Sequence, residues 1–196
     1  MTALFDGDEI FPPMLAAIHA ARTSIDFESY IDWSRPIGQQ FADALTERAQ
    51  HGIPVHVLLD WMGSAKLDAS LVEQLKRAGM QVYRYHPPSW YDIGRLDNRT
   101  HRKLLIVDGK LGFTSGVGIA PEWTGHAQDP AHWRDTHFKV EGPVVSQMQA
   151  VFLDNWIKIS GEALHGPAYF PVLPAVGASP AICSAARPPG GAKAWS

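Results

Sequence analysis

The sequence has almost no cysteine, no long apolar run and little net charge, and each shortage excludes a class of protein. The single cysteine, Cys183, excludes an internal disulfide framework and a zinc site built from several cysteines. No stretch approaches the roughly 18 apolar residues that a membrane-spanning helix needs, and no signal peptide is visible at the start. The net charge of -3 is too small and too negative for binding nucleic acid by bulk electrostatics. We therefore expect a soluble, cytoplasmic protein.

The composition that remains is that of an ordinary globular protein. The chain has 196 residues, of which 45% are hydrophobic and 19% charged, and this length can bury one core. Residues 161–196 differ, because they hold six Pro and five Gly and show no helical or strand period. We therefore predict one lobe over residues 1–160 and a linker or tail over residues 161–196.

The first half of the chain alternates between two hydrophobic periods. Helical spacing is found after Pro12, over residues 37–49 and over residues 71–78, whereas strand patterns occupy residues 24–31, 55–59 and 81–85. This alternation predicts an α/β fold with a largely parallel sheet.

The second half has a different pattern. Two apolar runs at 104–107 and 111–114 are joined by Asp108-Gly109-Lys110, which is a good hairpin turn. A loop rich in Trp and His, at 121–133, precedes a short predicted strand at 137–140 and a predicted helix that starts after Gly142-Pro143.

Residues suited to chemistry stand at the start of this hairpin. His101 and Lys103 are two apart, so they share one face of a strand. An imidazole beside an ammonium suits a phosphodiester, because the imidazole can attack phosphorus while the ammonium neutralises the oxygens. Asp108 has the opposite parity and begins the turn, so we expect a structural role for it. The hairpin should return Ser115 and Gly116 to this place, where a hydroxyl and glycine amides could hold phosphate oxygens.

The pattern His101-x-Lys103-x-x-x-x-Asp108, followed by Ser115-Gly116, resembles the signature of the phospholipase D superfamily. The similarity extends over roughly residues 5–170, and its flanking segments look like the bacterial cardiolipin synthase branch: residues 52–64, 98–103, 133–137 and 140–144. The resemblance implies an αβα sandwich with a mixed, largely parallel sheet. It also implies a covalent phosphohistidine intermediate, formed without a metal or another cofactor.

The resemblance also implies roles for single residues. The catalytic set would be His101, Lys103, Asp108 and Asp135, and the phosphate-binding set Lys103, Ser115 and Gly116. His101 would be the nucleophile. Asp135 matches the carboxylate that orients it, since an acceptor on one ring nitrogen fixes the tautomer and leaves the other free to attack. The implied substrate is a phospholipid of the phosphatidylglycerol or cardiolipin type, reached at the surface of the inner membrane. The implied partner is a second lobe with the same motif, or a second copy of this chain.

Two departures from the family pattern keep the function open. Gly118 stands where the family usually has an Asn that contacts phosphate. The family's active site also needs two motifs, one histidine attacking and one protonating the leaving oxygen, and this chain has one. His137-x-Lys139 does not supply the second, because Val144 occupies the position of its Asp. The candidates are half of a two-lobe phosphatidyltransferase, a homodimeric nuclease or phosphodiesterase, and a truncated or degenerate lobe without turnover.

Three weaker patterns surround the motif. Arg95, Arg99 and Arg102 form a basic cluster with Lys103, suited to an anionic headgroup, and Trp90 and Tyr91 could dip into a membrane interface, although we favour packing within the loop. A further group could suggest zinc: His126, Asp129, His132, Asp135 and His137. Its irregular spacing lacks a helical His-x-x-x-His pair, so we expect no metal.

Overall fold

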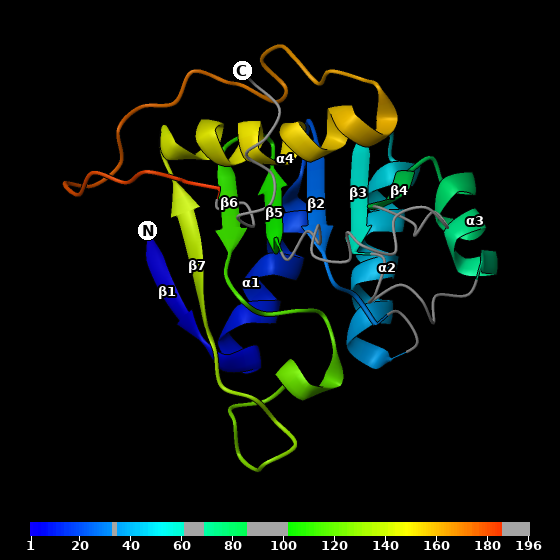
Figure 1. The fold of residues 1–196 in the computed structure, drawn as a ribbon, viewed down its shortest axis with the longest axis vertical. Coiled ribbons are helices and arrows are strands. Elements are labelled where there is room, and N and C mark those ends of the chain that lie inside the picture. The colour runs from blue at the N-terminus through cyan, green and yellow to red at the C-terminus, as the bar shows by residue number, and fades with distance from the viewer. Residues whose placement is uncertain (33–34, 61–68, 86–101, 186–196) are drawn as a thin grey trace, which may run out of the picture.

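The computed structural model describes residues 1–32, 35–60, 69–85 and 102–185 (Figure 1). Along the chain the elements are β1 (Thr2–Phe5), α1 (Asp6–Ala20), β2 (Ile25–Ser29), α2 (Pro36–Gln50), β3 (Val55–Asp60), α3 (Ala69–Arg77), β4 (Gln81–Tyr85), β5 (Leu104–Val107), β6 (Leu111–Thr114), the short 3-10 helix η1 (Pro121–Trp123), β7 (Thr136–Glu141) and α4 (Val144–Ser160). Within these ranges no helix combines the length and the hydropathy needed to cross a membrane.

All seven strands of these ranges form one sheet, in the order β1-β7-β6-β5-β2-β3-β4. The strands β2, β3 and β4 are parallel, and the four remaining neighbour pairs are antiparallel. Helix α4 crosses the strands on the face opposite to α1 and α2 (Figure 1). The αβα sandwich with a mixed sheet is therefore confirmed. Its parallel part is smaller than predicted, because no crossover helix separates β5, β6 and β7.

The central strand β2 separates two different cores. Its alternation places Ile25 and Phe27 in the apolar core under α1 and α2. Asp26 and Glu28 lie on the other face and are also buried. The Asp26 carboxylate lies 2.7 Å from His56 Nδ1 and accepts a bond of 2.8 Å from the Gln149 side chain. The face under α4 is thus packed partly by polar groups, which are buried in hydrogen-bonded pairs.

The first helix starts earlier than the sequence indicates. We predicted a helix opening at Pro12, but α1 begins at Asp6, and both Pro12 and Pro13 lie inside it. Its first turn is acidic, which suits the positive end of the helix dipole. The Glu9 carboxylate also accepts a hydrogen bond of 2.9 Å from the backbone N–H of Phe5. These contacts stabilise the extra turns although the two prolines donate no backbone hydrogen bonds.

The segment after α4 has no helix or strand over residues 161–185, and it lies along α4 (Figure 1). Leu164 is buried, and the backbone N–H of Cys183 donates a hydrogen bond of 2.9 Å to the Gln147 side chain. The Ser24 hydroxyl donates to the Ala168 carbonyl at 2.9 Å. The described part of this segment therefore packs against the lobe, and its status as a separate linker or tail stays a prediction.

Candidate active site

One edge of the sheet gathers most of the predicted site residues. The parallel strands β2, β3 and β4 end at this edge, β5 and β7 begin at it, and β6 ends at it. In open α/β sheets, ligands bind beyond the carboxyl ends of the strands, at a place where the strand arrangement changes. The junction of β2 with β5 is such a place, because the parallel pairing of β2 with β3 gives way to antiparallel pairing there.

The predicted hairpin forms, and its register brings Ser115 next to Lys103. Leu104 pairs with Thr114, and the Thr114 hydroxyl donates a hydrogen bond of 3.0 Å to the Lys103 carbonyl. Lys103 is only 7% exposed. Ser115 is half-buried and Gly116 is exposed, so a ligand at this edge can reach both. His101, two residues before Lys103, lies outside the described residues.

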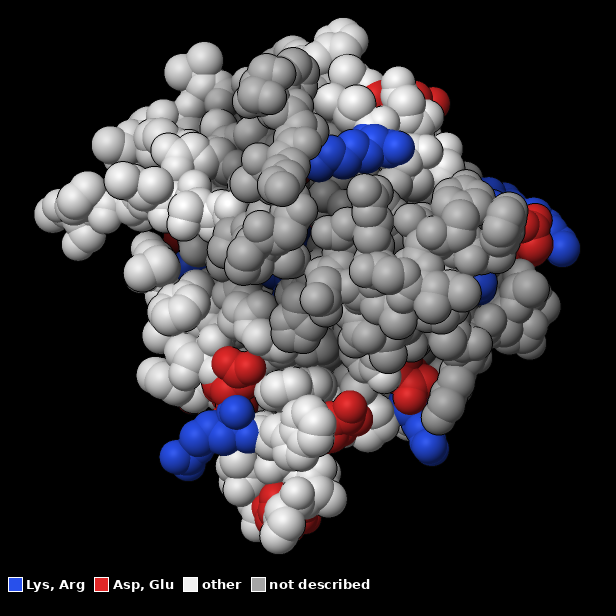
Figure 2. Space-filling model, viewed as in Figure 1, with Lys and Arg blue, Asp and Glu red and all other residues white. Residues whose placement is uncertain are grey.

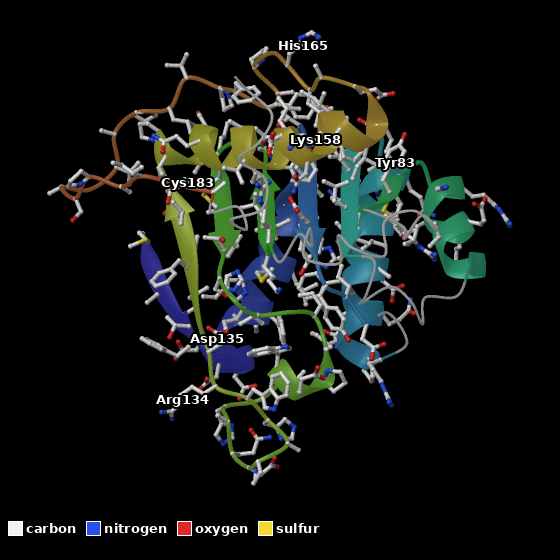
Figure 3. All side chains as sticks on the ribbon, viewed as in Figure 1. Tyr83, Arg134, Asp135, Lys158, His165 and Cys183 are labelled. Carbon is white, nitrogen blue, oxygen red and sulfur yellow. The ribbon has the colours of Figure 1, made fainter. Side chains whose placement is uncertain are left out.

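Asp135 lies directly against Gly116. A Cβ atom on Gly116 would stand 2.6 Å from an Asp135 carboxylate oxygen, so a larger residue at this position would require the Asp135 side chain to move. The other carboxylate oxygen accepts the backbone N–H of Thr136, and the Asp135 backbone exchanges hydrogen bonds with Asp6. Figure 3 shows Asp135 at the start of β7, at the end of the strand away from α4. The structure thus brings Lys103, Ser115, Gly116 and Asp135 to one edge.

His137 contacts the same site, although the sequence analysis weighed it only as part of a second motif and of a zinc group and rejected both. Its Nδ1 lies 2.5 Å from Ser115 Oγ, which also accepts the backbone N–H of Val117 at 3.1 Å. The side chain is 2% exposed, and burial lowers its pKa to about 4, so the ring is neutral near neutral pH. A signal was available, since His137 stands two residues after Asp135 and therefore shares its face of β7.

Asp108 lies at the opposite edge of the sheet. It is five residues from Lys103 along a strand, a separation of about 16 Å at the usual rise per residue. Its carboxylate accepts backbone hydrogen bonds from Arg22 at 2.9 Å, from Thr23 at 2.7 Å and from Ser24 at 3.2 Å. Burial alone would raise the pKa of Asp108, but these bonds outweigh it and hold the pKa below its ordinary value of 3.8. These contacts fit the structural role that we predicted.

Gly118, which replaces the family's usual Asn, is covered by Tyr30. A Cβ atom at position 118 would come within 2.8 Å of the Tyr30 ring. The neighbouring backbone is fixed as well, because Ile119 N–H donates to the Tyr30 carbonyl at 2.8 Å and Asp32 N–H to the Ile119 carbonyl at 2.7 Å. A longer side chain at position 118 therefore requires Tyr30 to move.

Of the predicted basic cluster, the structure describes Arg102 and Lys103. Arg102 reaches α4, where it donates to the Val151 carbonyl at 2.9 Å and lies 3.7 Å from the Asp154 carboxylate. The other members of this group and of the aromatic pair fall outside the described residues: Arg95, Arg99, Trp90 and Tyr91.

The residues that could have suggested zinc make separate contacts. His126 lies 3.3 Å from Asp8, and His132 lies 2.7 Å from Asp129. Among the residues that the structure describes, no three His, Cys, Asp or Glu side chains gather as metal ligands would.

Comparisons with known proteins match most of the chain to one family. The family described as "Cardiolipin synthase, PLD-like domain" matches residues 14–156. The chain is 36% identical over 159 residues to cardiolipin synthase 1 of Bacillus cereus, covering 80% of this chain and 31% of that protein. It is also 36% identical over 167 residues to the cardiolipin synthase of Halalkalibacterium halodurans, covering 85% and 33%. The chain thus spans about a third of the length of these relatives.

Solved structures share the fold at low sequence identity. Nuc, a phospholipase D family member from Salmonella typhimurium, aligns with a TM-score of 0.61 at 15% identity, over 81% of this chain and 94% of that one. The phosphatidylserine synthase of Haemophilus influenzae aligns with a TM-score of 0.59 at 16% identity, over 88% and 40%. From the extent of the sequence match, this chain belongs to the cardiolipin synthase, PLD-like domain family.

Proposed function

We propose that this chain is one lobe of an enzyme that transfers a phosphatidyl group between hydroxyls through a phosphohistidine on His101. The observation that carries the proposal is the hairpin register, which sets Ser115 and Gly116 beside Lys103 at the edge where Asp135 lies. A lysine, a serine hydroxyl and an exposed glycine at one edge suit the oxygens of a phosphodiester. The similarity to cardiolipin synthases supports a phospholipid of the phosphatidylglycerol type as the substrate.

The reaction takes place in two displacements at phosphorus. In the first, a nitrogen of His101 forms a bond to phosphorus, and the bond from phosphorus to the leaving alcohol oxygen breaks. A general acid gives that oxygen its proton. In the second, the hydroxyl of an acceptor lipid or of water attacks phosphorus, loses its proton to the same group and releases His101. Lys103 neutralises the phosphate oxygens, and Asp135 holds the nucleophile in the reactive tautomer.

The general acid must come from outside this sequence. The chain contains one His-x-Lys-x-x-x-x-Asp pattern, and we infer that the protonating histidine belongs to a second lobe with the same motif. That the chain spans only about a third of its relatives supports this arrangement. On the face seen in Figure 2, the described Lys and Arg side chains are scattered among Asp and Glu. The formal net charge of -3 favours a lipid over a nucleic acid.

A second candidate is a homodimer in which two copies supply both histidines. Its support is that this chain aligns over 94% of Nuc, so a protein of this fold can be as short as this one. A degenerate lobe without turnover is the third candidate, and Gly118 is the feature in its favour.

Turnover by separated oligomers distinguishes these candidates. Monomer and dimer fractions are assayed with phosphatidylglycerol and with an aryl phosphodiester, alone and after adding a lobe that carries a second motif. A missing general acid typically costs about 10²–10⁴ in rate, so we expect negligible turnover by the monomer and recovery with the second lobe. Activity confined to the dimer would favour the homodimer. A fully active monomer would contradict the need for two histidines.

A further inference from the structure

His137 contacts Ser115 of the proposed phosphate site and has no part in the mechanism above. The hydroxyl oxygen of Ser115 is held from two sides, by His137 Nδ1 at 2.5 Å and by the backbone N–H of Val117 at 3.1 Å. The His137 side chain is 2% exposed, and the ring of Phe113 lies next to it, 6.4 Å away between centroids. The imidazole is therefore fixed in place, and it fixes the Ser115 hydroxyl in turn.

The position of one proton on His137 decides what Ser115 can do. Because the neutral imidazole carries a single N–H, that proton is either on Nε2 or on Nδ1. His137 Nε2 is buried and has no hydrogen-bond partner among the described residues. A proton there would leave a buried donor without an acceptor, an arrangement that is rare in folded proteins. The contacts therefore favour the tautomer with the proton on Nδ1, which is then donated to Ser115 Oγ.

This tautomer leaves the Ser115 proton for a ligand. The hydroxyl oxygen then accepts from both His137 and Val117, so its two lone pairs are used and its own proton must be donated to a third group. Gly116, the next residue, is exposed, so this third group can approach from solvent. A phosphate oxygen is a strong acceptor for such a proton, because a hydrogen bond to a charged oxygen is stronger than a neutral one.

We propose that His137 is a positioning residue that orients the Ser115 hydroxyl to donate to a phosphate oxygen of the substrate. The inference rests on the proposed function and names a donor for its phosphate site. It also offers a substitute for the donor that Gly118 lacks, because Tyr30 occupies the space that a side chain at position 118 would need.

Vanadate affinity of the full chain tests this role. Ser115→Ala and His137→Leu should each weaken vanadate binding about tenfold to a hundredfold, as expected for one hydrogen bond to a charged group. His137→Asn should bind within about threefold of wild type, since its side-chain amide can donate from nearly the same place as Nδ1. The double variant Ser115→Ala/His137→Leu should bind no more weakly than either single variant, because the two residues act through one hydroxyl. His165→Asn is the matched control, at an exposed histidine beyond α4 (Figure 3).

The tautomer gives an independent measurement without any ligand. In ¹⁵N NMR of the imidazole nitrogens, the signal lost in His137→Asn should show a protonated Nδ1 and an unprotonated Nε2 at neutral pH. An Nε2–H tautomer would contradict the inference, and so would vanadate affinity in His137→Asn as low as in His137→Leu. If Lys103→Ala loses vanadate binding but Ser115→Ala keeps it, the phosphate site stands. The proposed role of His137 in orienting Ser115 is then rejected. If vanadate binding is unchanged in both Lys103→Ala and Ser115→Ala, the phosphate site itself is rejected. The NMR measurement would still show whether His137 donates from Nδ1 to Ser115.

Discussion

The two ends of the β5–β6 hairpin carry residues of one sequence motif, but the turn end has a structural role and the other end forms the candidate site. At the turn, the Asp108 carboxylate is surrounded by backbone donors from residues 22–24. At the other end, Lys103 and Ser115 lie beside each other, and Gly116 lies against Asp135 at an edge where Gly116 is exposed. The number of residues between Lys103 and Asp108 in the motif therefore corresponds to the length of strand β5. Lys103 lies at the site end of β5, and Asp108 binds the opposite end of the same strand to the loop between α1 and β2.

The largest expected effect is at the site end, in Asp135→Asn. If Asp135 orients the nucleophile, the amide favours the wrong tautomer, and the rate of phosphoenzyme formation should fall by about 10³–10⁴. The melting temperature should stay close to that of wild type, because the backbone contacts of Asp135 with Asp6 are unchanged. The measurement is the rate of labelling with substrate in the presence of the second lobe, beside a thermal melt. If the labelling rate of Asp135→Asn stays within tenfold of wild type, Asp135 does not orient the nucleophile.

Asp108→Asn tests the turn end and should have the reverse profile. All the donors from residues 22–24 reach Asp108 Oδ1, and Arg22 N–H also contacts Oδ2. An amide removes the negative charge that strengthens these bonds and turns an NH₂ group toward Arg22 N–H, so we expect a loss of about 2–4 kcal/mol in the free energy of unfolding. Labelling per folded molecule should be unchanged. Chemical denaturation measures the first quantity, with the exposed Asp43→Asn on α2 as a control that should change stability little. If Asp108→Asn keeps full stability but loses labelling, Asp108 has the catalytic role and our structural assignment is wrong.

Much of this arrangement could be predicted from the sequence, because it depends on local pattern. The parity of Asp108 against His101 and Lys103 indicated that it leaves their face, and the hairpin turn indicated that Ser115 returns to them. The start of α1 could not be predicted as easily, because Pro12 and Pro13 resemble a helix opening and the stabilising contacts come from Glu9 and the core. The pairing of Ser115 with His137 depends on the register of β6 with β7, which is set by tertiary contacts.

The free energy of unfolding should depend on pH through different groups at the two ends of the hairpin, His137 at the site end and Asp108 at the turn. His137 is a base whose pKa falls from 6.5 to about 4 on burial, so the unfolded chain binds its proton first as the pH is lowered. Stability is therefore full above pH 6.5 and is lost as the pH falls toward 4, by roughly 3 kcal/mol in total. His137→Asn should remove this slope. Denaturation midpoints at a series of pH values measure it, and an unchanged slope in the variant would mean that other groups cause it.

Asp108 acts in a lower pH range. Its pKa is held below the ordinary value of 3.8, so its contribution is present above that value and is lost as the pH falls through the lower pKa of the folded state. Asp108→Asn should therefore flatten the stability curve only below about pH 4. Flattening between pH 4 and 6.5 in this variant would contradict the assignment of that range to His137.

The smallest expected effect is at Gly118, where the family residue can be restored. Gly118→Asn should destabilise the fold by about 1–3 kcal/mol, since the side chain needs the space of the Tyr30 ring. Vanadate binding should not improve, because the phosphate donor in this chain is assigned to Ser115. Denaturation and vanadate titration of Gly118→Asn are compared with Gly118→Ala, which introduces only the Cβ. A stable Gly118→Asn variant with tighter binding would show that the missing asparagine limits this site.

We propose that the edge formed by Lys103, Ser115, Gly116 and Asp135 supports phosphatidyl transfer through His101. The most direct test is to trap labelled phosphatidylglycerol on the protein, supplied with the second lobe, and to locate the label by mass spectrometry. We expect a phosphoramidate on His101 that is stable in alkali and labile in acid, absent in His101→Asn and present in His165→Asn. Label on Ser115, or no label on any residue of this chain in an otherwise active preparation, would contradict the account.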